Sequence, residues 1–162
     1  MHHHEVEKFT GKFGVITCSS SRTEDEDESG KTIMELLENA GHEVVSYDVI
    51  MDDRDLIREK VQKFLEECDA IIISGGTGIT KYDVTVQAVS SLAEYEMTGF
   101  GHVFATLSYQ EIGTDAALSR STAYVVDRKP VFCLPGSPAG ARLGVADIIL
   151  KQISHIHHEL NR

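Results

Sequence analysis

The sequence predicts an α/β fold, specifically a three-layer α/β/α sandwich around a mostly parallel sheet. Short apolar runs alternate with stretches that place apolar residues at helical spacing, which is the pattern of strands joined by crossover helices. The run Ile71-Ile72-Ile73 has no polar residue, as expected for a strand buried on both faces. That run leads into three glycines, at positions 75, 76 and 78, and loops that follow parallel strands are where such sheets bind ligands.

The first half of the chain is predicted to contain three strands and two helices. Residues 13–18 form the first strand, followed by a polar loop at 19–29 and a helix that Gly41 ends. Residues 43–50 form the second strand, and residues 69–73 form the third. The inner faces of the two helices are Ile33, Leu36, Leu37 and Ala40 in the first, and Ile57, Val61, Phe64, Leu65 and Cys68 in the second.

The second half is less regular. Thr85 is expected to cap a helix that carries Val89, Leu92 and Ala93. Residues 103–108, 122–126 and 131–134 are strand candidates, the last being the clearest because Pro and Gly end it. Ser137 and Pro138 suit the N-cap and first turn of a final helix. The inner residues of that helix are predicted to be Val145, Ile148, Ile149, Gln152 and Ile156.

Length and charge restrict the classes of protein. A chain of 162 residues suits a single domain, 1–162, with a sizeable core. With 26 acidic and 15 basic residues the formal charge is −11, and no basic stripe is present, so we expect no binding to nucleic acid or to an anionic membrane surface. No apolar stretch approaches the roughly 20 residues of a membrane span, and the start lacks an apolar signal core, which predicts a cytoplasmic protein.

Cysteine and histidine do not indicate a metal site. Cys18, Cys68 and Cys133 are widely spaced within or next to apolar segments, which favours reduced core thiols. Histidines cluster near both ends of the chain, where exposed flexible ends, or an expression scar at the start, explain them. They are His2, His3 and His4, and His155, His157 and His158.

The glycine-rich segment Ser74-Gly75-Gly76-Thr77-Gly78 predicts a phosphate-binding loop. Glycine lacks a Cβ, so this backbone can adopt positive φ and bring its N–H groups close to an anion. The alternative is a plain turn between strand and helix. Glycines at 75, 76 and 78 do not have the spacing of G-x-G-x-x-G. A P-loop is also absent from the sequence, because its single Gly-Lys-Thr, at 30–32, has Asp25 where a P-loop begins with glycine.

Carboxylates follow two of the predicted strands. Asp83 lies five residues beyond Gly78, where it could hold Mg²⁺ against phosphate oxygens or stabilise a helix start. Asp52 and Asp53 also precede a helix, and capping is an equally good interpretation for them.

Two further segments suit an anionic ligand. Pro135-Gly136-Ser137 gives a rigid turn before a capped helix N-terminus. Ser119 and Arg120 offer a hydroxyl and a planar cation that fit a phosphate, although each is more often structural when taken alone.

Taken together, these motifs resemble the MoaB/MogA family of molybdenum cofactor biosynthesis, which is related to the gephyrin G domain, and MoaB most closely. The resemblance covers nearly the whole chain. Its parts occur in the family's order: SGGTG, then Asp83-Val84-Thr85, Gly99-Phe100-Gly101, Leu118-Ser119-Arg120, and Leu134-Pro135-Gly136-Ser137-Pro138.

The resemblance implies a molybdopterin adenylyltransferase that uses Mg²⁺ and ATP and releases pyrophosphate. Asp52 and Asp83 correspond to the functional aspartates, with Asp83 on the metal, and residues 74–78 would hold the ATP phosphates. The candidate residues for the pterin and its phosphate are Thr17, Ser19, Ser119, Arg120, Pro135, Gly136 and Ser137. The family also implies a homotrimer or hexamer and a possible metal-insertion enzyme as partner.

Departures from the family pattern keep a second function open. Val86 and Gln87 stand where relatives usually have Pro and Glu, and Met51 replaces a proline ahead of Asp52. If the missing acid supports the metal, the chain would be a pterin-binding or scaffolding protein without turnover. A nucleotide-dependent dehydrogenase is the third alternative, which the lack of G-x-G-x-x-G disfavours.

Overall fold

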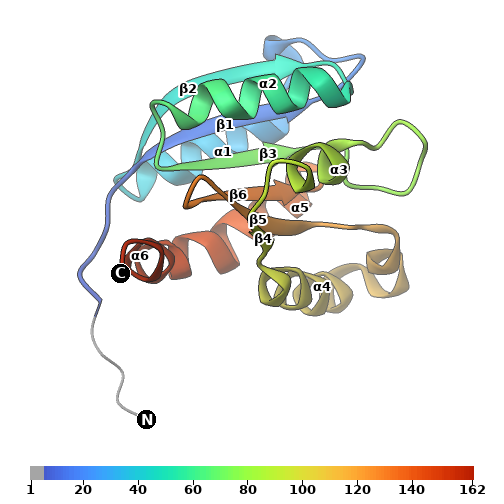
Figure 1. The fold of residues 1–162 in the computed structure, drawn as a ribbon. Coiled ribbons are helices and arrows are strands. Elements are labelled where there is room, and N and C mark those ends of the chain that lie inside the picture. The colour runs from blue at the N-terminus through green and yellow to red at the C-terminus, as the bar shows by residue number, and fades with distance from the viewer. Residues whose placement is uncertain (1–5) are drawn as a thin grey trace.

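The computed structural model describes residues 6–162 and contains a six-stranded sheet in the order β2-β1-β3-β6-β5-β4 (Figure 1). The strands are β1 (Lys12–Cys18), β2 (Glu43–Ile50), β3 (Ala70–Ser74), β4 (Tyr95–Glu96), β5 (Thr122–Val126) and β6 (Lys129–Leu134). β2, β1, β3 and β6 pair in parallel, whereas β5 and β4 run antiparallel to their neighbours. The predicted mostly parallel sheet is therefore confirmed.

Helices cover both faces of the sheet, as predicted. The helices are α1 (Glu28–Asn39), α2 (Arg54–Leu65), α3 (Thr85–Ser90), α4 (Thr98–Ile112), α5 (Pro138–Arg142) and α6 (Leu150–Leu160). A π-helical segment, η3 (Leu143–Ile149), joins α5 to α6, and 3-10 turns form η1 (Glu24–Glu26) and η2 (Gly113–Leu118). α2 and α3 pack on one face, and α1, α4 and the segment from α5 to α6 pack on the other (Figure 1).

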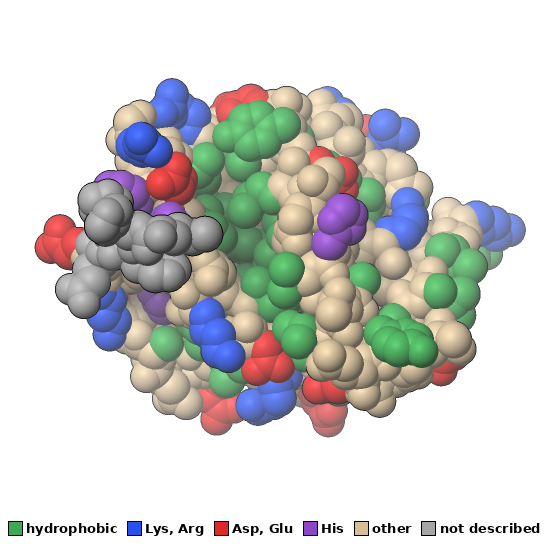
Figure 2. Space-filling view, turned by 90° about the horizontal axis from the view of Figure 1, so that it is seen from below, with side chains coloured by type: hydrophobic (Ala, Val, Ile, Leu, Met, Phe, Trp, Pro, Cys, Tyr) green, Lys and Arg blue, Asp and Glu red, His purple; other side chains and the backbone are tan. Residues whose placement is uncertain are grey.

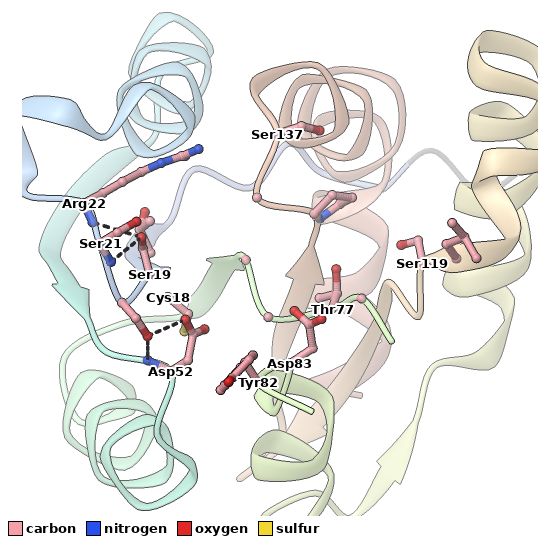
Figure 3. A pocket seen from close by; sticks show the side chains of 18 of the residues that line it. Cys18, Ser19, Ser21, Arg22, Asp52, Thr77, Tyr82, Asp83, Ser119 and Ser137 are labelled. Atoms are coloured by element: carbon pink, nitrogen blue, oxygen red, sulfur yellow. Dashed lines mark hydrogen bonds between the residues drawn. The ribbon is translucent and has the colours of Figure 1, made fainter. Parts of the chain in front are cut away.

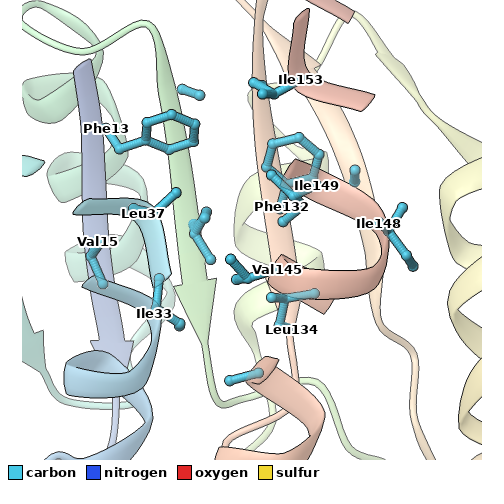
Figure 4. Packing of buried hydrophobic residues seen from close by; sticks show 14 of the residues in the cluster. Phe13, Val15, Ile33, Leu37, Phe132, Leu134, Val145, Ile148, Ile149 and Ile153 are labelled. Carbon is cyan, nitrogen blue, oxygen red and sulfur yellow. The ribbon is translucent and has the colours of Figure 1, made fainter. Parts of the chain in front are cut away.

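Alternation along the strands divides the core into two clusters. On β1, Phe13 and Val15 face α1 and the C-terminal helix, whereas Ile16 faces α2. Figure 4 shows the first cluster, in which Ile33 of α1 and Ile149 of η3 cover the same face of the sheet. All five of these side chains have no exposed surface, and burial of apolar area on this scale is the main force that holds the three layers together.

The strand register brings the three loops of interest to one end of the molecule. Thr17 pairs with Ser74, and Ser74 pairs with Leu134, so β1, β3 and β6 end side by side. Their following loops lie at the end opposite to the C-terminal end of α6 (Figure 1). The sequence segments 19–29, 75–84 and 135–137 therefore share one edge of the sheet.

The structure corrects three sequence-based expectations. Residues 103–108, a strand candidate, lie within α4, where Phe100, Phe104 and Ser108 are buried at helical spacing. Thr85 is the first residue of α3 rather than its cap, because its Oγ1 donates to the Gly75 carbonyl at 2.8 Å. The histidines at 155, 157 and 158 belong to α6 rather than to a flexible end, while His2, His3 and His4 lie outside the described residues.

The edge strand β4 borders a hollow on the face that carries α4 and α6. Figure 2 shows hydrophobic side chains gathered there. The hollow has a volume of about 300 Å³, and its apolar lining residues are Tyr95, Met97, Val125, Ile156 and Leu160.

Cys18, Cys68 and Cys133 are free and buried, as expected. Across residues 6–162, none of the helices has the length and apolar character that a bilayer crossing demands.

Candidate active site

A cleft of about 860 Å³ opens at the carboxyl ends of β1, β3 and β6, which is a typical volume for a small-molecule site. It gathers most of the predicted site residues, namely Thr17, Ser19, Asp52, Gly75, Gly76, Thr77, Gly78, Asp83, Ser119, Pro135, Gly136 and Ser137. Ser74 and Arg120 do not line it. Ser74 is fully buried beneath the floor, 3.3 Å from Thr17 Oγ1, and Arg120 lies behind the glycine loop.

The glycine loop forms the centre of the cleft. Gly75 and Gly76 have φ of +95° and +71°, conformations that glycine adopts without strain. The Gly75 amide donates to the Leu134 carbonyl at 3.0 Å, which ties the loop to the end of β6. Among residues 6–162, the amides of Gly76, Thr77 and Gly78 have no hydrogen-bond acceptor, so they are available to an anion.

Asp83 closes a tight turn at the far side of this loop. Its Oδ2 accepts hydrogen bonds from the Thr80 amide at 2.9 Å and the Thr80 hydroxyl at 2.7 Å. The same oxygen would lie 2.8 Å from a Cβ at Gly78, so only glycine fits there without a shift. Oδ1 has no hydrogen-bond partner among the described residues and is left for a ligand or a cation.

Arg120 holds the glycine loop from behind. Its Nε donates to the Gly78 carbonyl at 2.8 Å, its Nη2 to the Asp83 carbonyl at 2.9 Å, and its Nη1 to Gln87 Oε1 at 3.1 Å. The Arg120 amide also donates to the Thr77 carbonyl at 2.7 Å. Three of the five guanidinium N–H groups thus donate to the protein itself, and Arg120 does not line the cleft, so its role as a substrate-binding residue stays a prediction.

The two acids at 52 and 53 have different roles. Asp53 is the N-cap of α2, since its Oδ1 accepts from the Leu56 amide at 2.9 Å. Asp52 instead faces the cleft and accepts from the Ser20 hydroxyl at 2.9 Å (Figure 3). Capping was an open interpretation for both, and the structure assigns it to Asp53 alone.

The serine loop after β1 contributes residues that the sequence reasoning did not single out. Ser19 Oγ accepts from the amides of Ser21 at 3.4 Å and Arg22 at 3.1 Å, which folds the loop over the cleft. The additional lining residues are Cys18, Ser20, Ser21, Arg22, Tyr82, Asp115 and Leu118. The run Ser-Ser-Ser-Arg directly after a strand was the available signal for the first part of this set.

A buried carboxylate supports the floor beneath Thr17. Asp27 has no exposed surface, and it accepts hydrogen bonds from Thr17 Oγ1 at 2.7 Å, from the Gly30 amide at 3.0 Å and from the Tyr47 hydroxyl. Burial raises the pKa of Tyr47 and the bond to Asp27 raises it further, so Tyr47 remains a donor. Since the Thr17 hydroxyl donates its hydrogen bond to Asp27, it can only accept hydrogen bonds from a ligand in the cleft.

The third wall comes from the loop after β6. Ser137 caps α5 as predicted, accepting from the Gly140 amide at 3.1 Å. The Ser29 hydroxyl donates to the Gly136 carbonyl at 2.6 Å, which joins α1 to this loop. A Cβ at Gly136 would lie 3.4 Å from Gly75 Cα, so the second and third loops are in direct contact.

The lining of the cleft has more acidic than basic side chains, although among residues 6–162 no three His, Cys, Asp or Glu side chains are grouped so that they could hold a metal ion. Asp52, Asp83 and Asp115 contribute three carboxylates, and Arg22 is the one Lys or Arg among the lining residues of the described chain. Carboxylate and hydroxyl oxygens suit Mg²⁺, which commonly takes one or two protein carboxylates and completes its shell with water and substrate phosphates. Burial raises the pKa of the Cys18 thiol to about 12, so it remains protonated at neutral pH and is a poor nucleophile.

Comparisons with known proteins show which family this chain resembles. Residues 14–155 match the model of the MoCF_biosynth family, described as a probable molybdopterin binding domain. Over 151 residues the chain is 44% identical to molybdenum cofactor biosynthesis protein B of Bacillus cereus. The aligned part covers 91% of this chain and 89% of that protein.

Solved structures agree with the sequence match. A crystal structure of a molybdenum cofactor biosynthesis protein B superposes with a TM-score of 0.91 at 43% identity, over 95% of this chain and 98% of that one. The tungsten cofactor synthesizing protein MoaB from Pyrococcus furiosus superposes with a TM-score of 0.86 at 34% identity, over 94% and 98% of the two chains.

Proposed function

The chain belongs to the MoCF_biosynth family of probable molybdopterin-binding domains, and we propose that its cleft transfers AMP from Mg·ATP to the terminal phosphate of molybdopterin. The family resemblance that the motifs indicated is thereby confirmed, and with it a role in molybdenum cofactor biosynthesis. The finer proposal is carried by the amides of Gly76, Thr77 and Gly78, which have no acceptor within residues 6–162 and lie beside the Asp83 carboxylate.

In this mechanism the protein positions the reactants and neutralises charge. The free amides of the glycine loop bind the ATP phosphates, and the carboxylates of Asp83 and Asp52 orient the reacting groups from two sides of the cleft (Figure 3). Bound to Asp83 and the nucleotide, Mg²⁺ would supply charge neutralisation at the phosphates.

The acceptor requires no general base. The second ionisation of a phosphate monoester has a pKa of about 6, so an acceptor oxygen is largely unprotonated at neutral pH. That oxygen forms a bond to the α-phosphorus of ATP, and the bond from the α-phosphorus to the bridging β-oxygen breaks. Pyrophosphate leaves with the electron pair, and the product is a phosphoanhydride between AMP and the pterin. Holding the two phosphates in line is the main contribution expected from the protein.

A pterin-binding function without turnover is the alternative, and it rests on the departures at Val86 and Gln87, of which the missing acid at Gln87 bears on the metal. This side chain does not line the cleft, and its Oε1 accepts from Arg120 instead. The departure at this position therefore falls outside the reacting centre, which supports the catalytic proposal over the alternative.

Pyrophosphate release upon addition of molybdopterin and Mg·ATP tests the proposal. We expect Asp83→Asn and Asp52→Asn each to abolish most release while leaving the melting temperature nearly unchanged. Asp53→Asn is the matched control, because Asn still caps a helix and this side chain is not in the cleft. Pyrophosphate release that is absent in the unaltered protein, with pterin binding intact, would favour the alternative.

The proposal retains the wider expectations from the family. These are a single domain over 1–162, a homotrimer or hexamer, a cytoplasmic location and a metal-insertion enzyme that receives the product. Light scattering of the purified protein measures directly whether it is a trimer or a hexamer.

A further inference from the structure

The segment between Gly78 and Asp83 presents two exposed apolar side chains beside the cleft. Tyr82 is 67% exposed and Ile79 is 65% exposed, and Tyr82 lines the cleft next to Asp83 (Figure 3). Single exposed apolar residues are common on protein surfaces, so exposure alone has no meaning here. Three features of Tyr82 distinguish it from an ordinary surface residue.

The first feature is that the backbone around Tyr82 is fixed. The Tyr82 amide donates to Thr80 Oγ1 at 3.3 Å, and the Asp83 amide donates to the Thr80 carbonyl at 3.1 Å. Arg120 holds the carbonyls on both sides of the segment, at Gly78 and at Asp83. An aromatic ring on a fixed backbone loses little conformational entropy when it binds a ligand.

The second feature is the charge beside the ring. The Lys81 ammonium lies 5.2 Å from the ring centroid of Tyr82, within the range of a cation–π contact. Such a contact occupies one face of the ring. The opposite face remains available for stacking on a flat partner.

The third feature is the position of the ring relative to the phosphate site. Tyr82 precedes Asp83 directly, and both line the cleft with the glycine loop. A ligand whose phosphates contact the free amides of that loop would therefore carry its remaining part within the same cleft as Tyr82.

We infer that Tyr82 is a stacking platform for the planar fused heterocycle of a phosphorylated ligand. The inference rests on the proposed function, which supplies two ligands of this chemistry, the adenine of ATP and the pterin of molybdopterin. Stacking on an aromatic side chain requires only a π face and so suits either ring. Tyr82 acts in this role as a specificity-determining residue that favours base-bearing ligands over bare polyphosphate.

Calorimetric titrations with single ligands test the platform. The ligands are Mg·ATP, 6-hydroxymethylpterin monophosphate, and inorganic tripolyphosphate with Mg²⁺, which has no ring. We expect Tyr82→Ala to weaken binding of one ring-bearing ligand by about 5- to 150-fold, the range seen when a stacked aromatic is removed. Tyr82→Phe should keep the affinity, and tripolyphosphate should bind all three proteins alike. The ring-bearing ligand that loses affinity identifies the source of the stacked ring.

A fluorescence measurement gives an independent readout because the chain contains no tryptophan. Tyr82→Trp introduces a single indole in the cleft, whose emission should change upon titration with Mg·ATP if adenine stacks there. Tyr109→Trp is the control, since Tyr109 is 60% exposed on α4 and does not line the cleft.

The outcomes separate this inference from the proposed function. If Tyr82→Ala binds both ring-bearing ligands as the unaltered protein does, Tyr82 is not a platform, although the proposed function stands. If Tyr82→Ala weakens tripolyphosphate equally, the residue shapes the phosphate site and stacking is refuted. If the unaltered protein binds neither ring-bearing ligand, the proposed function fails, and the inference fails with it.

Discussion

The Arg120 side chain and the Asp83 main chain are joined by a hydrogen bond of 2.9 Å from Nη2 to the carbonyl oxygen. Because Nε of the same guanidinium holds the Gly78 carbonyl, one side chain fixes both ends of the segment that carries the proposed metal ligand. Arg120 is therefore a positioning residue, and its effect on the ligand is exerted through Asp83.

Arg120→Lys should impair the cleft without removing the charge. A lysine ammonium cannot replace a planar fork that donates to two carbonyls and an amide oxygen at once. We expect about 1–3 kcal/mol lower free energy of unfolding and weaker Mg·ATP binding, measured by denaturant titration and calorimetry. Unchanged Mg·ATP affinity in a destabilised Arg120→Lys protein would limit Arg120 to a purely structural role.

Gln87→Glu should stabilise the fold slightly. The new carboxylate would face Arg120 Nη1, which now lies 3.1 Å from Gln87 Oε1, and exposed ion pairs contribute about 0.2–1 kcal/mol. The Mg²⁺ concentration for half-maximal pyrophosphate release should stay the same, because residue 87 does not line the cleft. A fall of roughly 10- to 100-fold in that concentration, the size typical of residues that support metal ligands, would contradict this assignment.

Gly76→Ala should lower both stability and ATP affinity. Its φ of +71° is unfavourable for alanine, and a Cβ would lie 2.1 Å from Thr85 Oγ1 and 3.1 Å from Thr85 Cβ, both buried. We expect a loss of about 1–3 kcal/mol in the free energy of unfolding. Gly99→Ala is the matched control. It lies in α4 with no atom within 4 Å of the new Cβ and should stabilise by about 0.5–1 kcal/mol. Equal melting temperatures for the two variants would refute this prediction.

The surroundings of His42 lead us to expect a lower free energy of unfolding in mild acid. Burial lowers the pKa of His42 below its ordinary value of about 6.5, and the charge of Lys8 lowers it further. Its Nδ1 accepts from the Gly11 amide at 3.1 Å, which requires the unprotonated nitrogen. The stabilisation is thus fully present above about pH 6.5 and is lost as the pH falls through the lower value of the folded state. Melting curves between pH 5 and 8 should show a weaker pH dependence for His42→Gln; parallel curves would exclude the assignment.

Much of the fold followed from local patterns that tertiary contacts did not override. The run at 71–73 is buried on both faces of the sheet, as its composition indicated, and Ser137 caps α5 as its pairing with Pro138 predicted. Residues 103–108 were misjudged because a short apolar run fits a strand and a buried helical turn equally well. The spacing of Phe100 and Phe104, taken with Ser108, was the available correction.

The position of the site residues was predictable where the strand ends determine it. It was less predictable where a side chain can bond to several different partners. The glycines and the acids at 52 and 83 reach one cleft because the strands before them end in register. Sequence could not show that three N–H groups of the Arg120 guanidinium would donate to protein oxygens, because protein carbonyls and phosphates are both hydrogen-bond acceptors. The direction of the Arg120 side chain depends on a hydrogen bond to Gly78, which lies 42 residues earlier in the sequence.

The contact between the glycine loop and the loop after β6 has a dynamic consequence. The Gly75 amide is bonded to Leu134, Gly136 packs on Gly75, and Ser29 is bonded to Gly136, so three stretches of chain meet as one rigid floor. A hinge that opened the cleft would have to break all of these contacts together. Ligand exchange is therefore confined to movements of the serine loop and of the exposed side chains of Ile79 and Tyr82 on their fixed backbone. The backbones of free and ligand-bound forms should superpose closely outside the serine loop, with hydrogen exchange slow at the floor and fast in that loop.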